Sequence, residues 1–457
     1  PMTSSLIREQ VAQLTGRRFL ADYTSDDQEY KALMTSAITF GQTYNLRPGI
    51  ALTPQQMAHL TSDIVWLVEQ SVTLADGSTQ NVLVPQLYLK PQVGDLEGSG
   101  TLLAGKDINL NLSGDLTNSG TIAGRNVVSL TAQNVNNLGG LVQGSEMELA
   151  ALQDFNNEGG SINAVNKLTV NAGRDLNVQT TTRSGANAQS SHTVVDRVAG
   201  LYVSGANGAL VASAGRDLNI VAGVLANAGS GDSKLEAGNN LNLSTVKTGQ
   251  SHNIVWDANN RRNDRATQDL GSSVSGGGNV NLRAGNDLTA TAANVQAKEA
   301  RNVQATTINV QAGQASQTVD EAHQHTSKGF LSSTTVTTRD SSASTTALGS
   351  NLGGDTVSLN GTKDMNIKGS NEVADRDTTL TAGGNVNIEA AQNTSQQSSY
   401  RQETKSGLMS GGGIGVSVGT RKQSLDQQDT TTTAAASTVG AVNGNVTISA
   451  GNQYKQV

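Results

Sequence analysis

The string Ala-Gly-Arg-Asp-Leu-Asn-Val at residues 172–178 decides the fold, because close copies of it recur along the chain. Ala-Gly-Arg-Asp-Leu-Asn-Ile stands at residues 214–220, and Ala-Gly-Gly-Asn-Val-Asn-Ile at residues 382–388. The shared unit is Gly-x-Asp/Asn-φ-x-φ, where φ is an aliphatic residue. Early units start at residues 105, 124, 144 and 165, so the period is 19 to 21 residues. A fixed period of this size is the sequence signature of a repeat architecture.

Each unit contains three short strand patterns. A second copy of the motif follows eight residues after the first, and a shorter third element closes the early units. Three strands within about 20 residues describe one coil of a parallel β-helix, whose stacked coils share one core. Alternation with a period of two places Leu176 and Val178 inside the coil and Asn177 outside.

The corners between these strands explain why the repeat is rich in Gly and Asn and contains no Pro. Glycine and asparagine adopt positive φ at low cost and therefore suit tight corners. Proline would remove donors from the hydrogen-bond ladders, and all five Pro of the chain lie at or before residue 91. We therefore interpret the recurring Asp and Asn residues as turn formers and stacked side-chain ladders, not as metal-binding or catalytic groups.

The sequence predicts an all-β fold: a parallel β-helix of about 11 coils, expected to be right-handed, with hairpin insertions on alternate coils and a small α+β segment before it. Three parts are expected along the chain. Residues 1–92 form a small helix-helix-hairpin segment, residues 93–180 form regular coils, and residues 181–457 form coils that carry insertions.

The insertions follow from the spacing of the units. From residue 165 onward the distances between successive unit starts are 42, 23, 47, 23, 54, 21 and 60 residues, so every second coil carries an insertion. The four insertions are expected at residues 181–206, 246–276, 314–353 and 391–434. Insertions that are two coils apart should leave the same corner, about 10 Å from each other, and form a second layer along one edge.

The insertions are rich in Ser, Thr and Gln, yet each contains an apolar strand pattern, and residues 406–420 carry no charge. They are either surface hairpins that pack on their neighbours, or segments that enter a lipid bilayer or pair with another sheet. A strand that crosses a bilayer needs about 9–11 residues. The candidate membrane or partner contacts are Leu201, Tyr202, Trp256, Phe330, Leu331, Leu408, Met409, Ile414, Val416 and Val418.

The first 92 residues carry different signals. Ser25, followed by three acidic residues, predicts a helix start. A second helix is predicted over residues 53–68, and apolar runs on both sides of Asp76-Gly77 predict a hairpin. This segment is either a cap or insert seated on the repeat, or part of a receptor-binding surface.

Composition and motifs exclude several classes of function. The 31 Lys+Arg against 38 Asp+Glu give a net charge of −7, which does not support nucleic-acid binding. Without Cys there can be no disulfide, Cys-ligated zinc or Cys nucleophile. His323 and His325 with Asp320 and Glu321 form a weak candidate metal cluster, and the polar run after Trp256 is a solvated loop or a sugar platform. No P-loop, Gly-x-Ser-x-Gly or His-Glu-x-x-His motif occurs, so no enzyme activity, metal or cofactor is expected.

The repeat strings resemble filamentous-haemagglutinin repeats of two-partner-secreted bacterial exoproteins. The insertions, with Ser-Lys-Gly-Phe at residues 327–330 and Lys-Ser-Gly-Leu at residues 405–408, resemble the second haemagglutinin-repeat block of contact-dependent growth inhibition effectors of the CdiA family. Residues 52–85 resemble the stretch that joins the receptor-binding region of those effectors to this block. The resemblance covers essentially the whole chain.

The resemblance implies a non-enzymatic toxin-delivery module of a secreted, cell-surface exoprotein. It implies contact with the target-cell outer membrane and with an outer-membrane receptor protein, and help in moving a toxin into the periplasm. A two-partner-secretion transporter would act through regions absent here, and no nucleic acid is expected as a partner. The alternatives are a passive filamentous adhesin or stalk, and a polysaccharide-acting β-helix enzyme.

Overall fold

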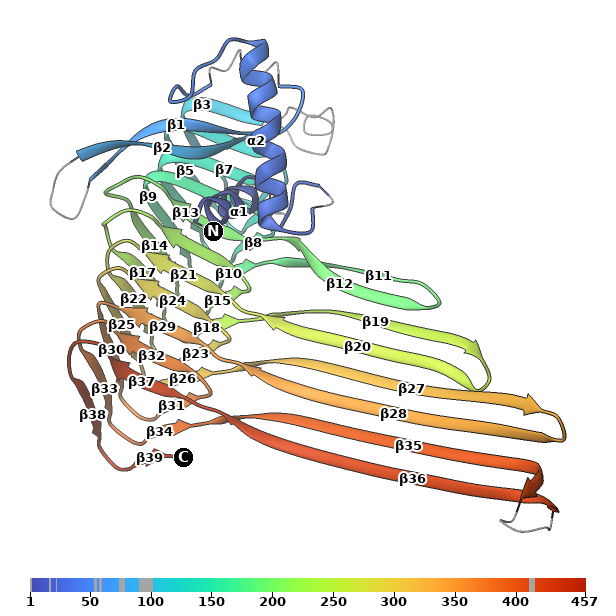
Figure 1. The fold of residues 1–457 in the computed structure, drawn as a ribbon. Coiled ribbons are helices and arrows are strands. Elements are labelled where there is room, and N and C mark those ends of the chain that lie inside the picture. The colour runs from blue at the N-terminus through green and yellow to red at the C-terminus, as the bar shows by residue number, and fades with distance from the viewer. Residues whose placement is uncertain are drawn as a thin grey trace. The chain divides into compact units, whose positions relative to one another are not determined.

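A computed structural model of the chain describes residues 2–15, 18–21, 23–52, 56, 60–73, 79–89, 102–410 and 416–457 (Figure 1). The chain forms two compact units. The first comprises Pro1–Thr181, Val195–Ala214 and Gly223–Gly231, and the second comprises Thr182–Val194, Gly215–Ala222 and Asp232–Val457.

The N-terminal part of the first unit contains two helices and a hairpin: α1 (Met2–Thr15), α2 (Asp26–Thr43), β1 (Ile64–Thr73) and β2 (Thr79–Tyr88). The helix start predicted at Ser25 is confirmed, because the Ser25 hydroxyl accepts a hydrogen bond from the Gln28 backbone N–H at 3.2 Å. Asp26, Asp27 and Glu29 occupy the first turn, where the helix dipole favours negative charge.

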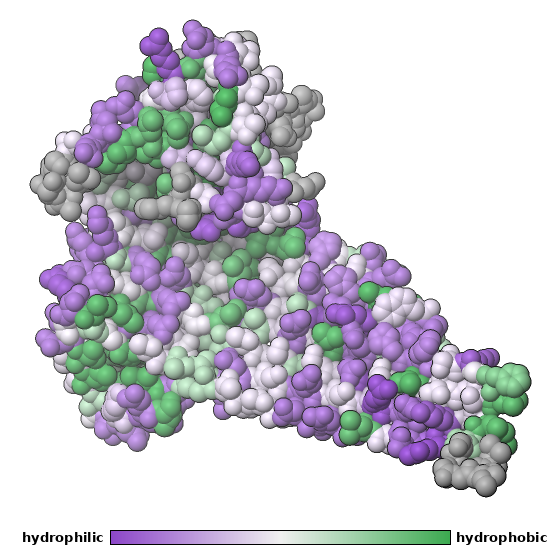
Figure 2. Space-filling view, viewed as in Figure 1, coloured by the Kyte–Doolittle hydropathy of each residue, from purple (hydrophilic) through white to green (hydrophobic). Residues whose placement is uncertain are grey.

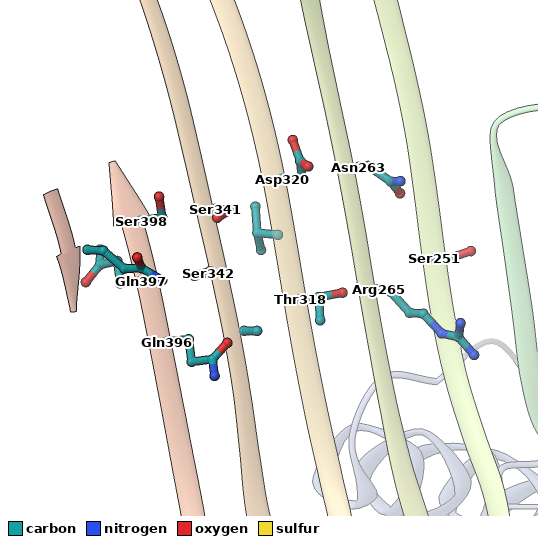
Figure 3. A pocket seen from close by; sticks show the side chains of 13 residues that line it. Ser251, Asn263, Arg265, Thr318, Asp320, Ser341, Ser342, Gln396, Gln397 and Ser398 are labelled. Carbon is teal, nitrogen blue, oxygen red and sulfur yellow. The ribbon is translucent and has the colours of Figure 1, made fainter. Parts of the chain in front are cut away.

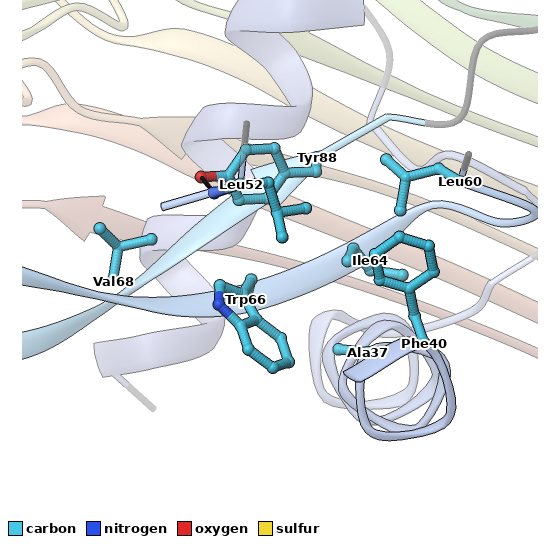
Figure 4. Packing of buried hydrophobic residues seen from close by; sticks show 8 residues of the cluster. All are labelled: Ala37, Phe40, Leu52, Leu60, Ile64, Trp66, Val68 and Tyr88. Atoms are coloured by element: carbon cyan, nitrogen blue, oxygen red, sulfur yellow. Dashed lines mark hydrogen bonds between the residues drawn. The ribbon is translucent and has the colours of Figure 1, made fainter. Parts of the chain in front are cut away.

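The helix predicted through residue 68 is wrong over its last part, because residues 64–68 belong to the strand β1. A short apolar run fits a buried strand as well as a helix, and here pairing with β2 along ten residues favours the strand. Ile64, Trp66 and Val68 of β1 pack against Phe40 of α2 and Tyr88 of β2 in one buried cluster (Figure 4). The predicted helix start at residues 53–55 and the Asp76-Gly77 turn lie outside the described residues.

The rest of the first unit consists of β-helix coils. Four long strands each run along two faces of a coil and pair in parallel with the equivalent strand one coil on: β3 (Leu102–Asn111), β5 (Thr121–Ala132), β7 (Leu141–Ala151) and β9 (Ser161–Ala172). In the next coils each of these two faces has a strand of its own. The first face contains β13 (Gly200–Val203) and β16 (Val224–Asn227), and the second face contains β14 (Ala209–Ala214). The third face is formed by β4 (Leu116–Asn118), β6 (Val135–Leu138), β8 (Phe155–Glu158) and β10 (Leu176–Gln179).

The second unit repeats the three faces, each a parallel ladder. The first is β21 (Ser273–Gly276), β24 (Asn294–Ala297), β29 (Asn351–Gly354), β32 (Asn371–Ala374) and β37 (Thr438–Ala441). The second is β17 (Ser233–Ala237), β22 (Val280–Ala284), β25 (Ala300–Ala305), β30 (Thr356–Gly361), β33 (Thr378–Ala382) and β38 (Val446–Ala450). The third is β15 (Leu218–Val221), β18 (Leu241–Ser244), β23 (Asp287–Thr291), β26 (Thr307–Gln311), β31 (Met365–Lys368), β34 (Val386–Glu389) and β39 (Tyr454–Gln456).

The predicted parallel β-helix is therefore confirmed. On the second face, the described strands number five in the first unit and six in the second, which agrees with the predicted number of coils. The alternation is confirmed as well, because Leu176 and Val178 are fully buried. Asn177 lies between them and donates to the Asn156 side chain at 2.8 Å, and Asn156 donates to Asn136 at 2.9 Å, so these outward residues form a ladder.

The Asp and Asn residues at the corners have the structural role that the repeat predicts. The Asp115 carboxylate accepts the Asn134 backbone N–H, the Asn134 side chain accepts that of Asp154, and Asp154 accepts that of Asp175, at 3.1 to 3.2 Å. In the second unit Asp217 accepts from the backbone of Asn240 in the same way. Each corner side chain thus satisfies a backbone donor in the next coil, where a strand ladder is interrupted.

The insertions form a single antiparallel sheet of eight strands in the second unit (Figure 1). Four hairpins supply it, and neighbouring hairpins pair with each other. The second layer predicted from the spacing is therefore confirmed. In chain order its strands are β11 (Thr181–Ala186), β12 (Ser190–Arg197), β19 (Val246–Asp257), β20 (Asn260–Leu270), β27 (Gly313–Gly329), β28 (Ser332–Leu348), β35 (Ala391–Ser410) and β36 (Val416–Ala435).

Strand spacing explains why the hairpins occur on alternate coils. Neighbouring strands lie about 4.8 Å apart both along the stack of coils and within the hairpin sheet. Two coils therefore advance by about 9.6 Å, which is also the width of one two-stranded hairpin. A hairpin on every coil would overlap its neighbour, and a hairpin on every third coil would leave a strand-wide gap. We refer to this sheet of β11 to β36 as the hairpin sheet.

Candidate contact surface on the hairpin sheet

The most exposed large apolar side chain among the described residues of the hairpin sheet, Phe330, lies where the third hairpin turns. β27 and β28 are joined by Phe330 and Leu331, between the paired residues Gly329 and Ser332. Leu331 has a φ of 66°, the left-handed value that a type II turn has at its third residue. Phe330 is 95% exposed and Leu331 is 62% exposed. Because the turn geometry fixes both residues at the end of the hairpin, neither side chain can fold back into the coil core.

The fourth hairpin places further apolar side chains beside this turn. Leu408 of β35 pairs with Val418 of β36, and Met409 is the next residue of β35. The Leu408 backbone N–H donates to the Leu331 carbonyl at 3.0 Å, which joins the ends of the two hairpins. Val418 is 80% exposed. Hydrophobic surface accordingly appears at the free end of the hairpin sheet in Figure 2. We call Phe330, Leu331, Leu408, Met409 and Val418 the apolar end.

The side chains of two other candidate residues lie outside the described part of the structure. Val416 is the first residue of β36, but its side chain lies outside the described part of the chain. Ile414 lies outside the described residues altogether.

Basic residues stand directly behind the apolar end, and the sequence analysis did not single them out. Lys405 and Arg421 are paired across β35 and β36, and Lys328 is the penultimate residue of β27. Lys405 also contacts Glu403 at 2.8 Å, and this contact lowers the pKa of the Glu403 carboxyl. From Ser406 to Thr420 the sequence carries no charge. The signal that could have revealed the arrangement is the Lys that stands one residue before Gly329-Phe330 and two residues before Gly407-Leu408.

Trp256 is exposed, but it does not belong to the apolar end. It lies near the turn of the second hairpin, and its ring lies 5.6 Å from the ring of His323. Pairing between β20 and β27 reaches only Ala322, seven residues before β27 ends at Gly329. At about 3.4 Å per residue, Trp256 is roughly 20 Å short of the apolar end.

Leu201 and Tyr202 were predicted as contact residues of the first insertion, and this is wrong. Both belong to β13, a coil strand paired with β9 and β16, and they are 0% and 8% exposed. The first hairpin ends at Arg197, so the chain has already returned to the coil. Residues 200–203 are buried on both faces of the strand. The repeat motif predicts burial of the inward face only, so it does not reveal that the outward face is covered too.

A polar network covers one face of the hairpin sheet beside Trp256. His252 contacts Asp264 at 2.9 Å, and Arg262 bridges Asp264 at 3.4 Å and Glu321 at 2.5 Å. The hydrogen bond with His252, assisted by Arg262, lowers the pKa of the Asp264 carboxyl. His323 lies 3.9 Å from Glu321.

The weak candidate metal cluster is not assembled. Adjacent strand residues point to opposite faces of a sheet, so Asp320 and Glu321 cannot converge on one ion. Among the residues that the structure describes, no group of three or more His, Cys, Asp or Glu could hold a metal.

Asp320 instead lines a shallow groove of about 500 Å³ on the opposite face (Figure 3). Its lining is mainly hydroxyl and amide side chains from six neighbouring strands, with Arg265 and Asp320 as the charged residues. Separately, no helix among the described residues is long and apolar enough to cross a membrane.

Comparison with known proteins places the chain among haemagglutinin-repeat proteins. Residues 331–455 match the family model described as Hemagglutinin repeat. The chain is 30% identical to "tRNA nuclease CdiA-2" of Burkholderia pseudomallei (strain 1026b), over 98% of this chain and 17% of that protein. It is also 30% identical to "Toxin CdiA" of Yersinia pestis, over 98% of this chain and 16% of that protein.

A "tRNA nuclease CdiA" of Burkholderia pseudomallei is 45% identical over 124 residues, or 27% of this chain and 10% of that protein. The chain thus spans less than a fifth of the length of these relatives. No solved structure matches the chain. The chain is a filamentous-haemagglutinin-repeat protein similar to the CdiA proteins over nearly its whole length.

Proposed function

We propose that this chain is a non-enzymatic delivery module of a secreted, cell-surface contact-dependent inhibition exoprotein. In this proposal the hairpin sheet contacts the outer membrane of a target cell and assists transfer of a toxin into the periplasm. The observation that carries the proposal is the apolar end, where Phe330 is 95% and Val418 is 80% exposed. A receptor protein of the target outer membrane and a two-partner-secretion transporter would be engaged through other regions.

The chemistry of the apolar end fits the interface of a bilayer. Burying an apolar side chain of this size is worth about 1.5–3 kcal/mol when it is complete. Lys328, Lys405 and Arg421 stand behind the apolar side chains, at the level where anionic headgroups would lie. A basic residue near an anionic membrane surface adds about 1 kcal/mol. Apolar residues in front of basic ones are typical of an interfacial anchor.

The strand pattern favours an anchor at the end of the sheet over a sheet that spans the membrane. β35 and β36 contain 20 residues each, which is more than the about 9–11 residues that a crossing strand needs. A spanning strand, however, alternates apolar and polar residues over that length. From residue 392 to residue 404 every residue of β35 is Ser, Thr, Asn, Gln, Tyr or charged, so only the end suits contact with lipid.

The non-enzymatic part of the proposal is supported by the repeat itself. The recurring Asp and Asn side chains accept hydrogen bonds from the backbone of the next coil, so a structural role accounts for them. The word nuclease in the names of relatives belongs to proteins of which this chain spans less than a fifth.

Flotation with vesicles that contain anionic lipid tests the membrane contact. The variant Phe330→Ser/Leu331→Asn keeps the turn, because Asn tolerates positive φ, and should lose most of its binding to vesicles. The matched control is Leu152→Ser/Val165→Ser, which removes two apolar side chains of 61% and 47% exposure from the coils. Equal flotation of both variants and the unchanged chain would contradict an anchor at the apolar end.

A second experiment tests delivery. In an effector that contains this module, residues 391–435 are deleted. The strands β34 and β37 are then joined by a short corner like the one that joins β31 to β32. Receptor binding and arrival of toxin in the periplasm are scored separately. Normal binding without arrival is expected. Normal arrival would favour the passive stalk over the delivery module.

A further inference from the structure

The polar run of residues 256–265 is divided between the two faces of the hairpin sheet. Its second part lies in β20, where adjacent residues point to opposite faces. Arg262 belongs to the polar network described above, whereas Asn263 and Arg265 line the groove of Figure 3. Arg261 stands two residues before Asn263 and so lies on the groove face as well. Because Arg262 is already engaged by carboxylates, a ligand of this run would bind on the groove face.

Two arginines of the groove face stand on either side of a small residue. Arg261 of β20 and Arg339 of β28 are both paired with Ala322 of β27, one from each side. Their backbones are therefore two strands apart, or about 9.6 Å, and only the methyl group of Ala322 lies between them. The Arg339 guanidinium also lies 6.0 Å from the centre of the Tyr400 ring. This arrangement leaves space above Ala322 where one anionic group can contact both guanidinium groups.

The arginines of the groove face have no carboxylate partner in the described part of the chain. Arg261, Arg265 and Arg339 form neither an ion pair nor a side-chain hydrogen bond there. By contrast, Arg262 and Arg401 on the opposite face each contact a carboxylate. A guanidinium group presents paired donors that match a phosphate or carboxylate group. The groove face is therefore complementary to an anionic ligand, although the net charge of the whole chain is −7.

The lining of the groove suits a ligand that is rich in hydroxyl groups. Hydroxyl and amide side chains such as Thr318, Ser341 and Gln396 line it, and they both donate and accept hydrogen bonds. A second hollow of about 410 Å³ adjoins the groove, and Arg265 lines both. The Asp320 carboxylate in the groove accepts hydrogen bonds only. It can therefore bind hydroxyl groups, but it repels a ligand that is anionic along its whole length.

We infer that the groove binds an anionic oligosaccharide. The phosphate or carboxylate groups of this ligand are bound by Arg261 and Arg339 on one side of the groove and by Arg265 on the other. Its hydroxyl groups bind Asp320 and the neighbouring hydroxyl and amide side chains. Arg261 and Arg265 are four residues apart on one strand, or about 14 Å, so separate anionic groups of one ligand occupy the two positions.

The position of the groove favours a glycan that extends from a cell surface over a lipid headgroup. Arg339 lies seven residues from Ser332, the first residue of β28, and is therefore about 24 Å behind the apolar end. The headgroup layer on each side of a bilayer is only about 5–8 Å thick. With the apolar end at a bilayer, the groove lies outside this layer, at the level of sugar chains. This choice of source rests on the proposed function, whereas the binding chemistry of the groove does not.

Calorimetric titration with a lipid-free oligosaccharide tests the inference. The probe is the phosphorylated core oligosaccharide released from lipopolysaccharide, and its dephosphorylated form should bind more weakly. Binding of the probe should saturate and should weaken as the salt concentration rises. Arg261→Gln/Arg339→Gln should raise the dissociation constant at least about tenfold, because charge-assisted hydrogen bonds are lost. The matched control Arg262→Gln/Arg401→Gln removes the same charge from the opposite face and should bind as the unchanged chain does.

The variant Asp320→Asn distinguishes an oligosaccharide site from a surface that binds any polyanion. It should weaken binding of the oligosaccharide, because an acceptor for sugar hydroxyl groups is lost. It should strengthen binding of polyglutamate, because a repulsive charge is removed. No binding of the probe would overturn the inference, and so would equal losses in the two double variants, equal binding of the dephosphorylated form, or polyglutamate that binds as tightly as the probe. Because the probe contains no lipid, these outcomes are independent of vesicle flotation, which tests the membrane contact.

Discussion

The coil core of the second unit contains one fully buried ion pair, and its replacement tests how the coils are stabilised. Arg301 of β25 and Glu372 of β32 are both 0% exposed, and the Arg301 Nη2 binds the Glu372 Oε2. Arg301 is paired between Val280 and Val357, and Glu372 between Leu352 and Val439. Both charges thus occupy positions that are aliphatic in the adjacent coils.

The expected change in stability follows from the buried polar atoms of this ion pair that have no hydrogen-bond partner. Arg301 Nε, Arg301 Nη1 and Glu372 Oε1 are buried without a hydrogen-bond partner in the protein. Each such atom costs about 1–3 kcal/mol. Burial outweighs the mutual attraction at both partners, because it raises the pKa of Glu372 to about 7 and lowers the pKa of Arg301 even though each group binds the other. On this argument Glu372→Leu or Arg301→Met alone destabilises the unit by about 3–5 kcal/mol, because it leaves one uncompensated charge.

The double variant Arg301→Met/Glu372→Leu should instead be neutral, or more stable than the unchanged chain by about 1–4 kcal/mol. Hydrogen exchange of peptides from β25 and β32 is the appropriate assay, because it reports the local opening free energy of stacked coils. Peptides from β7 serve as an internal reference in the first unit. A double variant that exchanges as fast as Glu372→Leu would refute the reasoning, because it would show that the pair itself stabilises the core.

Three further predictions concern other parts of the fold. Asn157→Ala removes a fully buried side chain that donates to the Gly160 carbonyl at 2.9 Å, and should cost about 1–3 kcal/mol of unfolding free energy. Asn177→Ala removes a half-buried side chain of the outward ladder and should cost at most about 1 kcal/mol. Urea unfolding measures both losses, and equal losses would contradict the distinction. Deletion of residues 313–348 should divide the hairpin sheet and accelerate hydrogen exchange in both β20 and β35. Deletion of residues 391–435 should leave β19 and β20 protected from exchange. Unchanged exchange after the first deletion would show that the hairpins are independent. Asp264 should titrate below its ordinary value of 3.8 by NMR, and His252→Gln should raise its pKa. Because the folded pKa is lowered, the contribution to stability is present above about pH 3.8 and is lost as the pH falls through the folded pKa.

The β-helix could be predicted because its physical requirements recur in every coil. Inward aliphatic residues, corner Gly and Asn, and the absence of Pro are each repeated, so one erroneous position does not change the conclusion. The hairpin sheet followed from the same regularity, since alternating spacings imply insertions at one corner.

Features that occur once could not be predicted in this way. Residues 64–68 form an apolar run whose helical and strand interpretations are equally good locally, and packing against Phe40 and Tyr88 decides between them. The burial of Leu201 and Tyr202 likewise depends on where the first hairpin ends. Arg301 and Glu372 are 71 residues apart, and nothing near either residue indicates that it points inward.

The candidate contact surface combines both kinds of feature. The apolar residues of the third and fourth hairpins were recognisable as strand patterns, but their meeting depends on hairpin length. The strands lengthen from 6 and 8 residues in the first hairpin to 12 and 11, 17 and 17, and 20 and 20 in the fourth. The third and fourth hairpins therefore end nearly level, which brings Leu331 to Leu408, while the second ends too early for Trp256 to join them.

The same progression makes each strand pair of the hairpin sheet longer than the one before it, and β36 is the last strand of the sheet among the described residues. Alternate-coil hairpins match the strand spacing, so each new hairpin covers the edge of the one before it and creates an edge of its own. A lengthening series makes every new edge longer than the last.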